Sequence, residues 1–267
     1  MSEHDAGNAP VVTEELRGHV LLMGLNRPAK RNAFNLEMLH GLVHAYQRLE
    51  DDPDAWVGVL FAHGDHFTAG LDLAEVASRI AEGEDFRAAE GVDPWGLVGR
   101  DRTKPVVAVA QGRCLTLGIE LLLASDIRIA AADSRFSQLE VQRGIYPFGG
   151  ATIRFPQEAG WGNAMRWLLT GDDFDVAEAL RIGLVQEVVD TGAQLARAVE
   201  LAEHIARRAA PLGVRATLAS ARRARVDGHQ AAADRLAKDV AALFHTADAA
   251  EGVASFIERR PADFQGR

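Results

Sequence analysis

Gln111-Gly-Arg-Cys-Leu-Thr-Leu-Gly-Ile-Glu120 is the stretch from which the fold can be inferred. It joins the Val-rich segment 105–111 to the apolar run 118–124, and so predicts a strand, a glycine-bearing loop and a helix in that order. Phe67-Thr-Ala-Gly-Leu-Asp72-Leu73 has the same design. Two strand-to-helix turns of this kind predict an α/β protein with parallel strands and right-handed crossovers.

The alternation of strands and helices extends from about residue 11 to residue 190. Strands are expected at 19–25, 56–62, 105–111 and 126–131, and helices at 36–49, 72–81, 118–124 and 160–169. Asn35 is expected to cap the first helix. Ala- and Arg-rich stretches at 193–209, 212–225, 229–245 and 247–259 predict further helices without strands. The chain therefore divides into a disordered N-terminus (1–10), an α/β core (11–190) and a helical region (191–267).

The composition excludes several classes of protein. With 267 residues and 48% hydrophobic content, the chain can bury a substantial core. A formal net charge of −9 argues against nucleic-acid binding, which needs clustered Lys and Arg. No apolar run reaches the roughly 20 residues of a membrane span, and the first ten residues lack the pattern of a signal peptide. The single cysteine, Cys114, excludes an internal disulfide framework, so a cytoplasmic location is expected.

The two glycine-bearing turns also suggest chemistry. The first turn of a helix has N–H groups without intrahelical partners and lies at the positive end of the helix dipole, so it attracts a negative oxygen. One such turn is common in α/β proteins and is most often only structural. Two that face each other would form an oxyanion hole.

Two carboxylates accompany the second turn. Glu120 lies in the apolar run Gly-Ile-Glu-Leu-Leu-Leu-Ala, where a lone charge is expensive to bury unless it is paired or used. The alternative to a catalytic role is a purely structural one, in which Glu120 is a first-turn glutamate that interacts with the helix dipole. Glu140 follows the strand-like residues Phe136-Ser-Gln-Leu. The alternative to a catalytic role is an ordinary solvated loop carboxylate.

Other reactive side chains have simpler interpretations. His63 and His66 lie three residues apart but have no third ligand nearby in sequence, so no metal site is expected. Cys114 lies in an apolar loop without a neighbouring histidine, which favours a packed residue over a nucleophile.

Four motifs together resemble the crotonase, or enoyl-CoA hydratase/isomerase, superfamily over essentially the full length of the chain. They are Leu25-Asn-Arg-Pro28 with Asn32-Ala33, then Phe67 to Leu73, then Lys104 to Asp126, and finally Leu139-Glu140 with Gly144, Pro147, Gly149 and Gly150. The resemblance implies a crotonase-type ββα spiral core, followed by a C-terminal helical region that mediates trimer formation.

The resemblance also implies roles for individual residues. The backbone N–H groups of Leu71 and Leu117 would form the oxyanion hole for a thioester oxygen. Glu120 and Glu140, twenty residues apart as in the hydratases, would activate water and deliver a proton to the α-carbon. The CoA moiety and substrate would contact Arg27, Lys30, Ala33, Ala69, Asp72 and Leu73.

The function expected from these residues is hydration of a 2-enoyl-CoA, with no cofactor because coenzyme A is part of the substrate. Δ3,Δ2-enoyl-CoA isomerisation is the alternative among enzymes, and it would need only one carboxylate. A non-catalytic acyl-CoA-binding subunit is the alternative outside enzymes. Leu71, Thr116 and Leu117 stand where hydratases commonly have small residues, which puts the acyl preference in doubt more than the chemistry. The expected partners are acyl-CoA and further copies of the chain, as a trimer or a dimer of trimers, with neither nucleic acid nor membrane.

Overall fold

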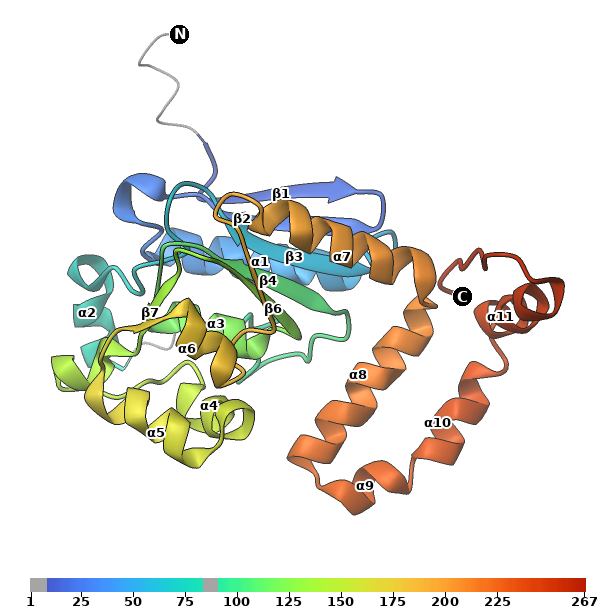
Figure 1. Ribbon diagram of the computed structural model, residues 1–267. Helices are drawn as coiled ribbons and strands as arrows, with labels where there is room; N and C mark the ends of the chain where they lie inside the picture. The colour runs from blue at the N-terminus through green and yellow to red at the C-terminus, as the bar shows by residue number, and fades with distance from the viewer. Residues whose placement is uncertain (1–8, 84–90) are drawn as a thin grey trace, which may run out of the picture.

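The computed structural model describes residues 9–83 and 91–267. Its larger sheet has six strands in the order β1-β2-β3-β4-β6-β9 (Figure 1). β1 is antiparallel to β2, and the other neighbours in this sheet are parallel. The strands are β1 Val12–Arg17, β2 Val20–Leu25, β3 Val57–Ala62, β4 Val106–Ala110, β6 Ile127–Ala131 and β9 Glu187–Val189. The predicted α/β class is confirmed, while β1, an edge strand rich in charged residues, was not expected.

A second, three-stranded sheet supports the site. Its order is β5-β7-β8, with β5 Arg113–Leu115 parallel to β7 Arg135–Ser137 and β8 Phe174–Asp175 antiparallel to β7. The segment 112–117, expected to be only a loop, therefore contains a short strand. That expectation was wrong because β5 exists through its pairing with β7, a partner about twenty residues further along the chain.

Helices connect the strands and form the whole C-terminal region. Asn35 caps α1 as predicted, because its side chain accepts a hydrogen bond from the Met38 N–H at 3.0 Å. The helix expected at 229–245 is interrupted and forms two helices. The α-helices are α1 Leu36–Asp51, α2 Leu73–Ala81, α3 Leu117–Ala124, α4 Ala151–Ala159, α5 Trp161–Thr170, α6 Val176–Arg181, α7 Gln194–Arg208, α8 Pro211–Val226, α9 His229–Ala233, α10 Leu236–Leu243 and α11 Ala247–Glu258.

The central strands β2, β3 and β4 of the six-stranded sheet are buried on both faces. In β2, Leu21 and Met23 face the main core beneath α1 and α3, whereas Val20 and Leu22 face α7. Successive side chains of a strand point to opposite faces of the sheet. Because both faces are covered here, every position is apolar and the strands appear in the sequence as continuous apolar runs. The buried residues of α7 are alanines, which let the helix approach the sheet closely. The first helix of the region 191–267 thus covers the sheet, and the predicted boundary at residue 190 stays a prediction.

The remaining helices, α8 to α11, form an arm that leads away from the core (Figure 1). Asp126 anchors the arm, because its carboxylate binds Arg222 of α8 at 2.9 Å and the buried Arg102 at 2.7 Å. Within residues 9–83 and 91–267, no helix is both long and apolar enough to cross a membrane.

Candidate active site

The first glycine-bearing turn, residues 67–72, is fixed by backbone pairing with Phe34. The Phe34 N–H donates to the Gly70 carbonyl at 2.8 Å, and the Asp72 N–H donates to the Phe34 carbonyl at 2.9 Å. In such a parallel bridge the residue between the two partners directs its own N–H away. The Leu71 N–H accordingly finds no acceptor in the described part of the chain.

The second turn leads from β5 into α3. Leu117 is the first residue of α3, so its N–H is one of the four that a helix leaves unpaired. No acceptor for it exists within residues 9–83 and 91–267. On the other side of this residue, the indole N–H of the buried Trp95 donates to the Leu117 carbonyl at 3.1 Å. Leu117 is thereby held in place while its N–H remains available.

The two turns are pressed against each other. Thr68 and Cys114 form a parallel bridge, which aligns the backbones of the two segments. A Cβ on Gly118 would lie 2.4 Å from the Thr68 methyl group, and a Cβ on Gly70 would lie 2.0 Å from the Thr116 hydroxyl oxygen. Only glycine permits this approach. The structure therefore brings the two sequence-predicted donor turns together.

Glu120 lies on α3 and is almost completely buried, with 1% of its surface exposed. Its Oε1 accepts a hydrogen bond from the Ala151 N–H at 3.0 Å, whereas its Oε2 has no hydrogen-bond partner among the residues that the structure describes. The absent side chain of Gly149 makes room for it, because a Cβ there would lie 2.5 Å from Oε2. Burial, together with the nearby charge of Glu140, raises the pKa of Glu120 to about 8, and the hydrogen bond from the Ala151 N–H opposes this shift.

Glu140 lies on the short 3₁₀ helix Leu139–Arg143 and is 6% exposed. The alternative of a solvated loop carboxylate is therefore wrong. Burial raises the pKa of Glu140 to about 7. With its amide oriented to match its neighbours, Gln138 donates to Glu140 Oε2 at 3.3 Å and to the Thr116 carbonyl at 3.1 Å. This buried glutamine links the second carboxyl to the second donor turn.

Sequence reasoning missed two contacts that complete this site, namely the Gln138 amide and the Ala151 N–H. Both belong to segments that the topology folds back over α3, so their neighbours in sequence carry no sign of the role. Gly149 was the available signal, because a residue whose backbone passes against a buried carboxyl cannot carry a side chain on that side.

The residues expected to contact CoA gather around the first turn. The Arg27 guanidinium donates to the Ala33 carbonyl and to the Asp72 carboxylate, both at 2.9 Å, and so forms an ion pair with Asp72. Lys30 is exposed on the neighbouring 3₁₀ turn Pro28–Lys30. The Ala69 N–H donates to the Arg31 carbonyl, which ties this turn to the first donor loop. Leu73 begins α2 and is 45% exposed.

The other reactive side chains have structural partners. His66 Nδ1 accepts a hydrogen bond from the Arg113 N–H at 3.1 Å, and His63 Nε2 is hydrogen-bonded to Thr13 at 2.8 Å. Cys114 is fully buried, and burial raises the pKa of its thiol well above the ordinary value. It packs between the two turns as an apolar residue.

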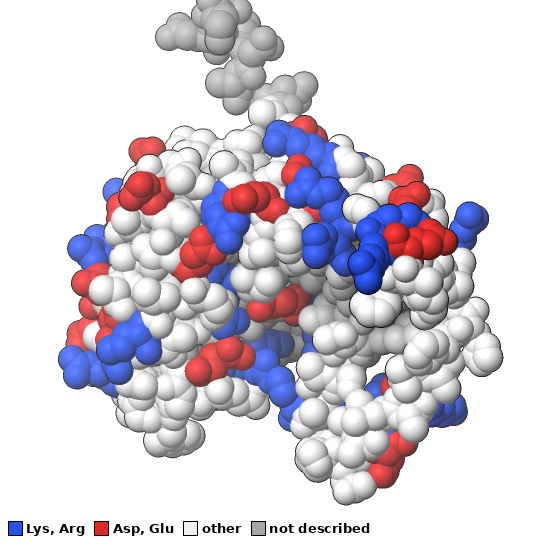
Figure 2. All heavy atoms as spheres, turned by 45° about the vertical axis from the view of Figure 1, so that its right-hand side comes forward, with Lys and Arg blue, Asp and Glu red and all other residues white. Residues whose placement is uncertain are grey.

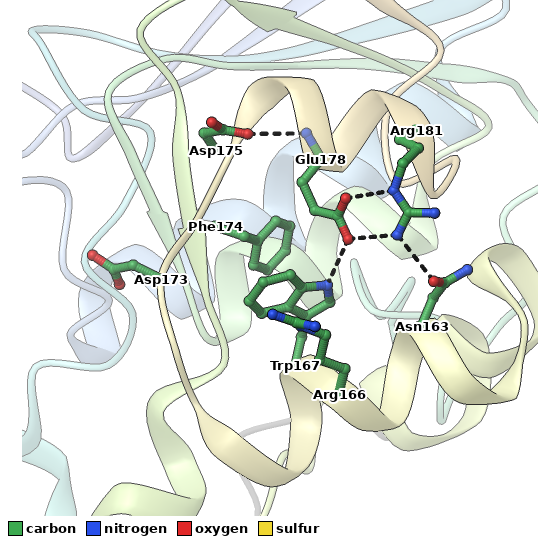
Figure 3. A pocket seen from close by; sticks show the side chains of 8 residues that line it. All are labelled: Asn163, Arg166, Trp167, Asp173, Phe174, Asp175, Glu178 and Arg181. Atoms are coloured by element: carbon green, nitrogen blue, oxygen red, sulfur yellow. Dashed lines mark hydrogen bonds and ion pairs between the residues drawn. The ribbon is translucent and has the colours of Figure 1, made fainter.

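A separate cavity of about 470 Å³ lies between α5 and α6 (Figure 3), and neither Glu120 nor Glu140 lines it. Two of its charged groups bind each other: Arg181 forms two hydrogen bonds to Glu178, which also accepts from the Trp167 indole N–H at 3.2 Å. The Arg166 guanidinium lies over the Trp167 ring, 4.9 Å from its centroid. The hydrogen bonds from Arg181 lower the pKa of Glu178, which is opposite to the raised pKa values of Glu120 and Glu140.

The two-sheet topology and the buried carboxyl pair beside two donor turns define the class, an α/β spiral protein of the crotonase type. A family model described as enoyl-CoA hydratase/isomerase matches residues 15–267, and the chain belongs to that family.

Named relatives agree with this assignment. Enoyl-CoA hydratase EchA19 of Mycobacterium tuberculosis is 35% identical, with 97% of this chain and 98% of that protein covered. Crotonyl-CoA hydratase of Syntrophomonas wolfei is 36% identical, with 90% and 92% covered. The crystal structure of a probable enoyl-CoA hydratase/isomerase from Mycobacterium abscessus is 51% identical and superposes with a TM-score of 0.94, covering 97% of this chain and all of that one.

Proposed function

We propose that this chain catalyses the reversible addition of water to a 2-enoyl-CoA to give a 3-hydroxyacyl-CoA. The observation that carries the proposal is a pair of buried carboxyls, with pKa values of about 8 and about 7. They lie beside two turns whose Leu71 and Leu117 N–H groups have no acceptor in the described stretches 9–83 and 91–267. Relatives named as enoyl-CoA hydratases and a crotonyl-CoA hydratase support the same reaction.

In this proposal the thioester oxygen accepts hydrogen bonds from the N–H groups of Leu71 and Leu117. The donors withdraw electrons from the conjugated double bond and stabilise the enolate that forms when water adds. Glu120 accepts a proton as the water oxygen bonds to the β-carbon, and Glu140 donates its proton to the α-carbon. One carboxyl gains the proton that the other loses, so the pair is reset by exchange of a single proton with solvent.

The two pKa values suit a reversible reaction. Burial raises both toward neutrality, so near pH 7 one carboxyl can hold a proton while the other is ionised. Hydration starts with the proton on Glu140, and dehydration of a 3-hydroxyacyl-CoA starts with the proton on Glu120.

Further parts of the proposal concern cofactors and assembly. The reaction needs no cofactor, because coenzyme A is part of the substrate. A homotrimer, or a dimer of trimers, is supported by the apolar side chains that the C-terminal arm exposes, among them Phe244 (68% exposed), Phe256 (84%) and Ile257 (72%). Figure 2 shows that the arm side of the hollow beside it is largely uncharged, whereas acidic and basic side chains lie along the opposite wall. Cytoplasmic residence is proposed from the single cysteine.

The test is to follow the conjugated-thioester absorbance of crotonyl-CoA and longer 2-enoyl-CoAs with the purified protein. We expect absorbance to fall as the 3-hydroxyacyl-CoA forms, and Glu120→Gln and Glu140→Gln each to lose at least about 100-fold in kcat. Turnover of a 3-enoyl-CoA, without hydration at any chain length, would establish isomerase activity instead. Binding of acyl-CoA with no turnover of either substrate would identify the non-catalytic alternative.

A further inference from the structure

Thr116 has an unusual backbone conformation, with φ 51° and ψ −117°. A β-branched residue rarely adopts positive φ, because this conformation strains its backbone. Glycine would adopt this conformation without strain. Strain of this kind in a turn that carries a proposed donor indicates that the side chain contributes something glycine cannot.

The ψ angle of Thr116 places its side chain beside the Leu117 N–H. In an L-residue the Cβ is rotated by about 120° from the backbone nitrogen around the Cα–C bond, so a ψ of −117° brings Cβ nearly into eclipse with the nitrogen of the next residue. In a trans peptide the N–H of that residue lies on the same side as the preceding Cα. The side chain of Thr116 therefore adjoins the Leu117 N–H.

The hydroxyl of Thr116 also lies against the other donor turn. A Cβ on Gly70 would be only 2.0 Å from Thr116 Oγ1, so the oxygen lies directly over the Gly70 backbone, next to Leu71. The hydroxyl is thus flanked by both residues whose N–H groups are proposed to bind the thioester oxygen.

The hydroxyl is firmly placed and has no partner of its own. The Thr116 N–H donates to the Ser137 carbonyl at 2.9 Å, and the Thr116 carbonyl accepts from the Glu120 N–H at 3.2 Å and from the Gln138 amide at 3.1 Å. Within the described residues, Oγ1 takes part in no hydrogen bond. Thr116 is half-buried, so a ligand can reach its side chain.

We propose that the Thr116 hydroxyl is a third hydrogen-bond donor to the thioester oxygen, in addition to the N–H groups of Leu71 and Leu117. The inference rests on the proposed acyl-CoA function and extends it to a side chain. A hydroxyl can rotate its proton toward an oxygen on which negative charge develops, and a fixed donor of this kind acts mainly in the transition state. Thr116 is then a catalytic residue that a glycine-lined turn would lack.

Kinetics of three variants test the role. Thr116→Val keeps the shape and the β-branch but removes the donor, and we expect kcat to fall about 10- to 100-fold with KM changed less than about 3-fold. Thr116→Ser keeps the donor and should stay within about 3-fold of the parent. Thr116→Gly relieves the strain yet should be as slow as Thr116→Val. Thr152→Val, at an exposed position of α4, is the matched control and should be unaffected. A Thr116→Val or Thr116→Gly enzyme as fast as the parent would overturn the inference.

A vibrational measurement separates this inference from the proposed function. Butanoyl-CoA labelled with ¹³C at the thioester carbonyl cannot react, and hydrogen bonds to its oxygen lower the carbonyl stretching frequency. We expect a clear lowering on binding to the parent and to Thr116→Ser, and a smaller one with Thr116→Val. Equal lowering in all three proteins would overturn the role of Thr116 alone. No lowering with the parent would overturn both the inference and the proposed function.

Discussion

Replacing Glu120 by Gln is expected to make the folded protein more stable at pH 8 while it removes activity. Glu120 is buried, one of its oxygens has no partner, and its pKa is raised to about 8. In the unfolded chain the same carboxyl ionises near 4.5. Between these values the folded protein holds a proton that the unfolded chain releases, so stability falls as the pH rises through this range. Glutamine removes the ionisation and keeps an oxygen for the Ala151 N–H.

The magnitude follows from the two pKa values. Complete linkage over the interval from 4.5 to about 8 corresponds to ~5 kcal/mol at and above pH 8. Water entry and relaxation around an ionised buried group reduce such penalties, so we expect Glu120→Gln to be more stable than the parent by about 2 kcal/mol at pH 8. Near pH 5 the parent carboxyl is protonated and resembles the amide, and the two proteins should then agree within about 0.5 kcal/mol.

The assay is urea unfolding of both proteins at pH 5.5, 7.0 and 8.5, at one protein concentration because assembly contributes to apparent stability. Glu37→Gln, at an exposed position in the first turn of α1, is the control, and its effect should stay below about 0.5 kcal/mol at every pH. A stability difference between parent and Glu120→Gln that is independent of pH, or that grows toward acid, would refute the assignment of a raised pKa to this carboxyl.

Three further predictions concern the same elements. The pH profile of kcat/KM should be bell-shaped, with its maximum between about pH 7 and pH 8. Below the maximum both Glu120 and Glu140 are protonated and no base remains, and above it both are ionised and no acid remains. A sigmoid profile would contradict this. Gly70→Ala should lower the free energy of unfolding in urea by at least about 2 kcal/mol, because φ is +88° and the added Cβ meets Thr116. Gly162→Ala in α5, which has open space around it, should raise that free energy by about 0.5 kcal/mol. Equal effects would contradict the close approach of the turns. Asp126→Asn should lower the free energy of unfolding by about 3 kcal/mol or more, because the buried Arg102 loses its ion-pair partner. The amide hydrogens of α8 should also exchange faster, since Arg222 loses the same carboxylate. Unchanged exchange in the arm would show that the ion pairs do not anchor the arm.

The parts of the fold that could be predicted from sequence are those specified by neighbouring residues. The strand at 57–62 is apolar throughout because both its faces are covered, and the first helix shows its cap at Asn35 and its apolar spacing. Glu120 could be singled out for the same reason: one charged residue within an apolar helix is expensive, and its burial is confirmed.

The parts that could not be predicted depend on pairing between distant segments. β5 has only three residues, and only its register with β7 makes it a strand. Glu140 has no local sign of burial, because the cover comes from the fold around its 3₁₀ helix. Thr116 was visible in sequence as a departure from glycine, but its positive φ and the position of its hydroxyl depend on both donor turns being in place.

The site concentrates features that each oppose folding. In the part of the chain that the structure describes, an ionisable carboxyl is buried with one oxygen unpaired, a β-branched residue is strained, and two backbone donors lack acceptors. Such features persist only where the surrounding structure over-determines them, and here the surroundings supply that constraint through Gln138, Trp95 and the glycines at 70, 118 and 149. A thioester oxygen would satisfy the unpaired donors, and a water molecule would give the Glu120 carboxyl its missing partner. The unsatisfied groups at this site are thus ones that the proposed substrates would satisfy, which is expected of an enzyme rather than of a passive acyl-CoA carrier.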